Sequence, residues 1–294
     1  MTQRVSLVTG TSSGFGWHTA LELARHGDRV FAGMRNPADR NREAAGRMAE
    51  MAAAEGLALS VVAMDVTSQE SVDSAVAEVI EQAGRVDAVV NNAGFGVMGP
   101  WELATVDQAK LQFDTNLFGC VRTSKAVVPH MRAQGTGWIV NVGSEAGLVA
   151  VPFEAYYTCA KFALAGLTQT MRFELSQFGI RVVYLVPGAY METRFGDNAI
   201  DLTLKATAEA GPYQPLARHM AEQFNKWVTT VTGEEFGRKV AEILDDPDPP
   251  CHVHAGADEW RVRPRSVDEA EADIMDFFEL HQFMYPWRRG PAAG

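Results

Sequence analysis

Residues 5–16 read V-S-L-V-T-G-T-S-S-G-F-G, an apolar run that passes directly into a glycine-rich turn. The run predicts a buried strand, and a helix is predicted to begin at about Gly16. Gly10, Gly14 and Gly16 permit a tight turn, and without a Cβ atom the backbone can approach a pyrophosphate closely. The N-terminus of the helix would offer N–H groups and the positive end of its dipole to the phosphates. The stretch therefore predicts a dinucleotide site, with an ordinary strand-to-helix turn as the alternative.

The rest of the chain repeats this alternation of apolar runs and helical patterns. Uninterrupted runs such as V-V-Y-L-V at 182–186 are typical of strands that helices cover on both faces. The pattern predicts an α/β fold, a doubly wound (Rossmann) parallel sheet of seven strands in a single domain spanning 1–294. Strands are predicted at 5–9, 30–32, 59–64, 88–91, 138–142, 182–186 and 252–255. Helices are predicted near 16–26, 38–55, 69–83, 102–133, 155–178 and 234–244.

Two segments depart from this alternation of predicted strands and helices. Residues 189–232 follow the sixth predicted strand, and a connection of that length predicts a substrate-binding lid. The C-terminal tail, 267–294, mixes acidic and aromatic residues. An amphipathic helix packed on its own domain is predicted for the tail, with a subunit contact as the alternative.

Composition excludes several classes of protein. The chain is 47% hydrophobic and 21% charged, as in ordinary globular domains. A net charge of −11 argues against a nucleic-acid-binding surface, which needs clustered Lys and Arg. We expect no signal peptide and no membrane span, because no long apolar segment is present. The three cysteines are far apart and show no zinc spacing, so we expect free thiols, no metal and a cytoplasmic location.

Residues 155–161 read A-Y-Y-T-C-A-K and place a phenol near an ammonium group. On a helix, residues four apart share a face, so Lys161 pairs with Tyr157 and not with Tyr156. A surface Tyr–Lys pair is the alternative to a chemical role.

Met34 and Arg35 follow the second predicted strand. An acidic residue at this place commonly selects NAD by bonding the ribose hydroxyls. The planar guanidinium of Arg35 suits a 2′-phosphate instead. The sequence therefore predicts a preference for NADP(H), with NAD(H) as the other cofactor and a solvated surface charge as the alternative for Arg35.

Further motifs follow in order: N-N-A-G at 91–94, Asn116 in F-D-T-N-L-F-G, Ser144 in I-V-N-V-G-S and P-G at 187–188. With the glycine turn and the Tyr157–Lys161 pair, they make the chain resemble the short-chain dehydrogenase/reductase family. The resemblance is to the compact branch, over roughly residues 4–190. In motif style it is nearest to hydroxysteroid and retinol dehydrogenases.

The resemblance implies roles for four catalytic residues. Tyr157 would be the general acid/base, and Lys161 would hold the nicotinamide ribose and lower the pKa of the phenol. Ser144 would orient the substrate oxygen, and Asn116 would anchor a water-linked proton path.

The resemblance also implies the cofactor contacts. Asp65 and Val66 would lie beside the adenine ring, and Thr193 stands one position later than the usual threonine. The expected contacts are Gly10, Thr11, Ser12, Ser13, Gly14, Phe15, Gly16, Arg35, Asp65, Val66, Asn92, Ala93, Gly94, Tyr157, Lys161, Pro187, Gly188, Tyr190 and Thr193.

An apolar and bulky ketone or secondary alcohol is the expected substrate. Its expected contacts are Phe95, Ser144, Phe153, Tyr156, Tyr157 and Phe195.

The functional hypothesis is an NADP(H)-dependent oxidoreductase that interconverts a ketone or aldehyde and an alcohol. An NAD-preferring dehydrogenase, a nucleotide-binding regulatory or scaffold protein without turnover, and a sugar-nucleotide epimerase or dehydratase are the alternatives. By analogy, the resemblance implies a homodimer or homotetramer formed through the helices of 102–133 and 155–178.

Overall fold

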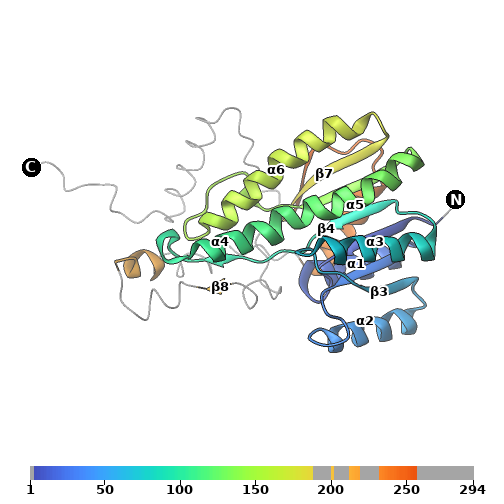
Figure 1. Cartoon of the computed structure of the whole chain (residues 1–294), viewed down its shortest axis with the longest axis horizontal. Helices are drawn as coiled ribbons and strands as arrows, with labels where there is room; N and C mark the ends of the chain where they lie inside the picture. Colours follow the sequence, from blue (N-terminus) through green and yellow to red (C-terminus); the bar gives the residue numbers. More distant parts are fainter. Residues whose placement is uncertain (1–2, 188–199, 202–211, 219–231, 257–294) are drawn as a thin grey trace, which may run out of the picture.

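The fold is built around a parallel sheet of seven strands (Figure 1). The computed structural model describes residues 3–187, 200–201, 212–218 and 232–256. The strand order is β3-β2-β1-β4-β6-β7-β9, and every neighbouring pair is parallel. The predicted doubly wound sheet is therefore confirmed. Its strands are β1 (Val5–Thr9), β2 (Arg29–Met34), β3 (Leu59–Ala63), β4 (Ala88–Asn91), β6 (Gly137–Val142), β7 (Ile180–Pro187) and β9 (His252–Ala255).

The winding of the sheet reverses between β1 and β4. The chain runs outward from β1 to β3 on one side and then returns to start the other side at β4. Strand β1 therefore pairs with both β2 and β4. Ligands of such sheets bind beyond the carboxyl ends of the strands at this reversal. The glycine turn after β1 and the N-N-A-G turn after β4 both lie there.

Helices cover both faces of the sheet. On one face, Met48 and Phe236 pack in one apolar cluster with Val8. On the other face, Val127 packs in a second cluster with Leu7, the preceding residue of the same strand. This alternation explains why the strands are apolar at nearly every position. The first face carries α1 (Gly14–Arg25), α2 (Arg42–Glu55) and α10 (Gly233–Asp245), and the second carries α3 (Gln69–Ala83), α5 (Gly119–Gln134) and α6 (Ala155–Ser176).

The single helix predicted at 102–133 is wrong, because this segment contains several elements. Thr105 has extended backbone and forms a capping box with Gln108, which starts a new helix. That helix then passes through a π turn before α5. The elements not anticipated are β5 (Val97–Met98), η1 (Trp101–Leu103), α4 (Val106–Phe113), η2 (Asp114–Phe118), η3 (Glu145–Gly147) and β8 (Ile200–Asp201).

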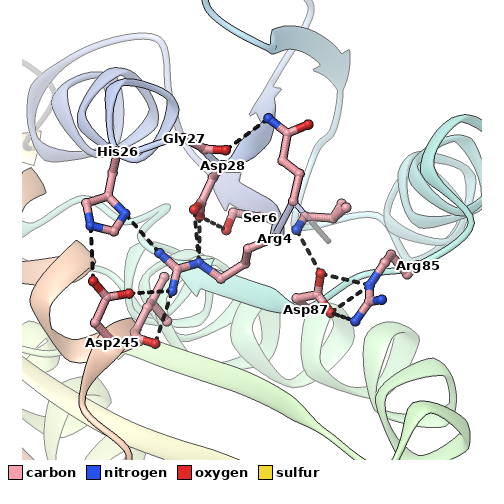
Figure 2. Close-up of polar contacts among 11 residues, drawn as sticks. Arg4, Ser6, His26, Gly27, Asp28, Arg85, Asp87 and Asp245 are labelled. Carbon is pink, nitrogen blue, oxygen red and sulfur yellow. Dashed lines mark hydrogen bonds and ion pairs between the residues drawn. The ribbon is translucent and has the colours of Figure 1, made fainter. Parts of the chain in front are cut away.

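Five polar residues form a network at the amino end of the sheet, which we call the polar clasp: Arg4, Ser6, His26, Asp28 and Asp245 (Figure 2). Asp28 is buried and accepts hydrogen bonds from Arg4 Nε at 2.9 Å and from Ser6 Oγ at 2.6 Å. Arg4 Nη1 also donates to Asp245 Oδ1 at 2.9 Å, and the other oxygen of Asp245 lies 3.0 Å from His26 Nε2. The clasp thus joins β1 to the C-terminal ends of α1 and α10.

The predicted lid at 189–232 and tail at 267–294 lie outside the described residues, apart from 200–201, 212–218 and Thr232. Among the helices that the structure describes, none has the length and apolar character that crossing a membrane requires.

Candidate active site

The glycine turn has the conformation that its sequence requires. Gly10 and Gly14 have φ angles of 71° and 59°, in the left-handed region that L side chains rarely adopt. A Cβ atom on Gly10 would lie 2.7 Å from Ala93 Cα, and one on Gly16 would collide with Asn92 Nδ2. The turn is therefore closely packed against the N-N-A-G turn after β4.

Thr9 fixes these two turns to each other. Its Oγ1 accepts hydrogen bonds from the backbone N–H groups of Asn92 and Ala93, both at 3.0 Å. Asn92 Nδ2 donates back to the Thr9 carbonyl oxygen at 2.9 Å. The predicted cofactor residues of β1 and β4 are thus held in one rigid unit.

The N-terminus of α1 opens onto this unit. Ser13 is the N-cap residue and has extended backbone, but its side chain makes no capping bond. The N–H groups of a first helical turn have no partner within the helix and suit an anion. Thr11 lies behind the turn, where its N–H and Oγ1 both donate to the Gly33 carbonyl at 3.1 Å. The ring of Phe15 stacks on Phe236 at 4.0 Å, so that side chain serves the packing of α10.

Asp65 and Val66 occupy the turn after β3. Asp65 Oδ1 accepts bonds from the N–H and the hydroxyl of Thr67 at 3.0 and 2.7 Å. Val66 is buried, and a Cβ atom on Gly119 would lie 2.9 Å from its Cγ2. The carboxylate of Asp65 therefore stabilises the turn in which Asp65 itself lies.

Arg35 lies exposed at the end of β2, directly after the buried Met34. Its carbonyl oxygen accepts a hydrogen bond from Asn41 Nδ2 at 2.5 Å, which orders the following loop. Arg40 in this loop and Arg42 at the start of α2 are also exposed. Three arginines thus follow β2 closely, together with the exposed acidic residues Asp39 and Glu43.

Asn116 is buried in the π turn η2. Its Nδ2 donates to the Phe95 carbonyl at 2.9 Å, and its Oδ1 accepts from the Phe95 N–H at 3.1 Å. Both ends of the amide thus hold the segment after β4, while η2 itself packs against α6. The side chain positions Phe95, a predicted substrate contact.

Tyr157 and Ser144 form the centre of the site. A side-chain hydrogen bond joins them, and it favours the phenolate. Burial and the nearby charge of Glu154 outweigh this bond and raise the pKa of Tyr157 above its ordinary value. This direction is opposite to the one that the resemblance implies for the phenol. Ser144 Oγ also accepts a hydrogen bond from the Ala146 N–H at 3.1 Å.

Lys161 lies on the same side of α6 as Tyr157. Its ammonium nitrogen is 5.5 Å from the centre of the Tyr157 ring and donates to the Val142 carbonyl at 2.7 Å. Burial lowers the pKa of Lys161 to about 8, while the nearby Cys120 opposes this change. The predicted pairing of Lys161 with Tyr157 thus corresponds to the observed placement, and Tyr156 lies half-buried on a different side of the helix.

The sequence model of the short chain dehydrogenase family matches residues 4–201 of this chain. The chain belongs to this family. It is 36% identical over 198 residues to 3-ketodihydrosphingosine reductase of Bacteroides thetaiotaomicron, covering 67% of this chain and 68% of that protein. Human 17-beta-hydroxysteroid dehydrogenase type 1 is 36% identical over 212 residues, 69% of this chain and 63% of the relative. A short-chain dehydrogenase structure from Streptomyces avermitilis matches with a TM-score of 0.75 at 26% identity, covering 97% and 99% of the two chains.

The family resemblance seen in the motifs is therefore confirmed. As a member of this family, the protein is an oxidoreductase that acts on CH–OH groups with NAD or NADP.

Tyr184 is a residue of the site that the motifs did not reveal. Its side chain is fully buried, and its hydroxyl accepts from the Ser144 N–H and donates to the Lys161 carbonyl, both at 3.2 Å. Its ring fills the space where Gly143 lacks a Cβ atom, and its hydroxyl fills the corresponding space at Gly147. The glycines on both sides of Ser144 indicate in the sequence that a bulky group lies close to this turn. Only the fold shows that this group is Tyr184.

Some predicted contacts cannot be placed. Pro187 ends β7 and is half-buried. Gly188, Tyr190, Thr193 and Phe195 lie outside the described residues. In the part of the chain that the structure describes, no group of His, Cys, Asp and Glu has the arrangement of a metal site.

Proposed function

We propose that the protein is an NADP(H)-dependent oxidoreductase that interconverts a ketone or aldehyde and an alcohol, with Tyr157 as general acid/base. The proposal depends on one observation: a buried phenol is hydrogen-bonded to Ser144 and lies beside the buried ammonium of Lys161. This group of residues follows β6 and begins α6, at the carboxyl edge of the sheet. It lies on the same edge as the turns that would hold the cofactor.

The residues present fit a nicotinamide dinucleotide. Gly10 and Gly16 leave backbone where a Cβ atom has no room, and the open N-terminus of α1 suits the pyrophosphate. Asn92 and Gly94 lie on the turn that would face the riboses. When bound, the nicotinamide supplies or accepts the hydride, which no side chain can do.

Tyr157 and Ser144 supply the proton transfer. In the reducing direction a carbonyl oxygen becomes an alkoxide and needs a proton. The neutral phenol, which burial favours, is the form that donates this proton. Ser144 would hydrogen-bond to the same oxygen as its charge develops. In the oxidising direction the phenol must lose its proton, and the ammonium of Lys161 stabilises the resulting phenolate.

The preference for NADP(H) rests on Arg35. Met34 stands where an acidic residue would select NAD, and the exposed Arg35 follows it. A guanidinium binds phosphate through two parallel hydrogen bonds. Arg40 and Arg42 add positive charge between β2 and the first turn of α2. These three side chains favour the cofactor with the extra phosphate.

An apolar substrate is supported by the residues around the phenol. Phe95, Phe153 and Tyr156 are each partly exposed near the start of α6 or after β4. One relative is named for a ketone of a long-chain base and another for a hydroxysteroid. We infer that this chain also takes a ketone or secondary alcohol with a substantial apolar part, bound in part by the 189–232 lid.

Oligomerisation through α5 and α6 is supported by exposed apolar side chains. Phe173 is 80% exposed and Phe162 is 45% exposed, and a separation of eleven positions places both on one face of α6. Phe118 is exposed just before α5. We infer a homodimer or homotetramer in which this face is covered, and a monomer mass by light scattering would contradict it. We infer a reducing, cytoplasmic setting from the three free thiols.

Replacement of the phenol tests the proposed function. Wild-type protein should change the nicotinamide absorbance with NADPH and an apolar ketone. Tyr157→Phe should lower kcat by about 100- to 10,000-fold, the contribution of general acid catalysis, while NADPH binding measured by fluorescence stays near wild type. Tyr156→Phe is the matched control and should stay within about tenfold, because its hydroxyl has no part in proton transfer.

Two outcomes would contradict the proposal. Near-full turnover by Tyr157→Phe would remove Tyr157 as the acid. NADPH binding without turnover of any carbonyl compound by the wild-type protein would favour a regulatory or scaffold role.

A further inference from the structure

Tyr184 carries a buried hydroxyl that the proposed proton transfer does not use. The residue lies on β7, which runs beside α6 in the fold (Figure 1). It is wholly buried. A buried hydroxyl destabilises the fold unless it is hydrogen-bonded, whereas the ring of a phenylalanine would fill the same space without that requirement. The contacts of the hydroxyl therefore indicate why a tyrosine stands here.

The Tyr184 hydroxyl joins the turn after β6 to helix α6. It accepts a hydrogen bond from the Ser144 N–H at 3.2 Å, and the Ser144 carbonyl oxygen lies 3.4 Å away. It donates to the Lys161 carbonyl at 3.2 Å. A hydroxyl can donate one hydrogen bond while it accepts another. The same group thus holds the backbone of Ser144 and the backbone of Lys161.

The turn that carries Ser144 has room for the phenol because of two glycines. A Cβ atom on Gly143 would collide with the Tyr184 ring, and one on Gly147 would collide with its hydroxyl. A Cβ atom on Gly147 would also lie 2.8 Å from the Lys161 carbonyl oxygen. The turn and α6 therefore meet closely at the Tyr184 hydroxyl.

The two residues that this hydroxyl joins have their side chains beside Tyr157. Ser144 is hydrogen-bonded to the phenol of Tyr157, and the Lys161 ammonium lies 5.5 Å from the centre of its ring. A shift of the turn relative to α6 would change the distance from Ser144 Oγ to the Tyr157 oxygen. A catalytic group that is displaced by about 1 Å can lose about 100-fold in rate.

We propose that Tyr184 is a positioning residue, whose hydroxyl places Ser144 relative to Tyr157 and Lys161 for the reaction. The inference rests on the proposed function, since Ser144 and Tyr157 would both act on the carbonyl oxygen. Tyr184 is wholly buried and does not reach the substrate, so it acts through the turn that carries Ser144.

A double-mutant cycle tests this role, with NADPH and octan-2-one as the probe substrates. Tyr184→Phe removes the hydroxyl and keeps the ring. It should lower kcat by about 10- to 100-fold, as expected for a misplaced catalytic group. In the Ser144→Ala background the same change should lower kcat by less than about threefold, because the group that Tyr184 positions is absent. NADPH binding, measured by fluorescence, should stay near wild type in Tyr184→Phe.

Val183→Ala is the matched control. Val183 is the preceding residue of β7, and it packs in the apolar cluster on the other face of the sheet. The change should lower the unfolding temperature, because it leaves a cavity in the core. It should keep kcat within about threefold of wild type in both backgrounds, since it leaves the Tyr184 hydroxyl in place. Thermal unfolding of every variant shows whether folded proteins are compared.

Equal losses of kcat in the two backgrounds would overturn the inference, because they would show a general effect on the fold. An unchanged kcat in Tyr184→Phe would overturn it as well. Gly147→Ala, whose added methyl group would displace the hydroxyl, carries the same cycle if Tyr184→Phe does not fold. Failure of the proposed function has a different signature: the wild-type protein would oxidise no NADPH with octan-2-one or any other ketone, and the inference would fall with it.

Discussion

At the scale of single residues, burial determines the charge states in this site. The pKa of Tyr157 is raised, that of Lys161 is lowered to about 8, and that of Glu154 is raised to about 7. In each case burial is the largest cause, because a dry environment disfavours the charged form. The neutral form of the Tyr157 phenol is therefore favoured, which suits the proton donation proposed for it.

Arg35 provides a test of cofactor choice. Arg35→Ala should lower kcat/KM with NADPH by about 10- to 100-fold, as expected when a phosphate loses a charged partner. The value with NADH should change by less than about threefold, since NADH lacks the 2′-phosphate that this contact would serve. The control is Arg238→Ala, an exposed change on α10. An equal effect on both cofactors would show that Arg35 serves the loop and not the phosphate.

Glu154 should make stability depend on pH. The folded state raises the pKa of this carboxyl from 4.5 to about 7, so its protonated form is favoured in the folded protein. Its contribution to stability is fully present below about pH 4.5 and is lost as pH rises through about 7. Each unit of difference between the two pKa values changes the free energy of unfolding by about 1.4 kcal/mol, so the whole difference corresponds to up to about 3 kcal/mol.

Glu154→Gln, which stays neutral, should therefore unfold at about the wild-type temperature at pH 4. It should unfold several degrees higher at pH 8. Thermal unfolding followed by circular dichroism at pH 4 and pH 8 measures the difference in unfolding temperature between the variant and wild type. The same difference at both pH values would mean that the carboxyl does not titrate in this range. Glu145, on η3, has a pKa raised in the same direction, and Glu145→Gln shows how much of the pH dependence belongs to that neighbour.

At the scale of elements, tight turns and one buried ring hold the groups proposed to be catalytic. The Tyr184 ring lies under the turn that carries Ser144, and a side chain at Gly143 would overlap it. Gly143→Ala should consequently destabilise the fold by about 1–3 kcal/mol, the range for overpacking. Gly46→Ala is the matched change on the exposed face of α2, where no atom lies within 4 Å of an added Cβ.

Gly46→Ala should stabilise α2 by about 0.5–1 kcal/mol, because alanine favours a helix. Urea denaturation of both variants measures the two free energies. A loss of stability in Gly46→Ala, or none in Gly143→Ala, would contradict this view of the turn.

The sequence could predict the parts of the site that local patterns encode. The glycine turn and the Tyr157–Lys161 pairing follow from spacing along one or two elements, and the doubly wound sheet follows from the alternation of apolar runs and helical patterns. Tyr184 and the raised pKa of Glu154 were missed, because both depend on which distant segments pack around these residues. The capping box of Thr105 and Gln108 was also missed, although T-x-x-Q is a short local motif that the sequence carries.

At the scale of the whole molecule, the end of the sheet opposite the site is closed by the clasp around Asp28. This carboxylate is buried, and Arg4 is its charged partner. Arg4→Met should lower the free energy of unfolding by about 3 kcal/mol, because it leaves a buried charge unpaired. Arg4→Met combined with Asp28→Asn should recover much of that loss, since Ser6 can still bond to the amide. A double variant no more stable than the single one would show that packing of Arg4, and not its charge, is what matters.

The position of β9 has a consequence for synthesis of the protein on the ribosome. Strand β7 pairs with β6 on one side and with β9 on the other, yet sixty-four residues separate Pro187 from His252. While those residues are being translated, V-V-Y-L-V presents an uncovered strand edge of the kind that attracts other nascent chains. The edge of β7 stays uncovered until β9 leaves the exit tunnel and pairs with it. Slow codons placed between the two strands would lengthen this time and lower the yield of folded enzyme.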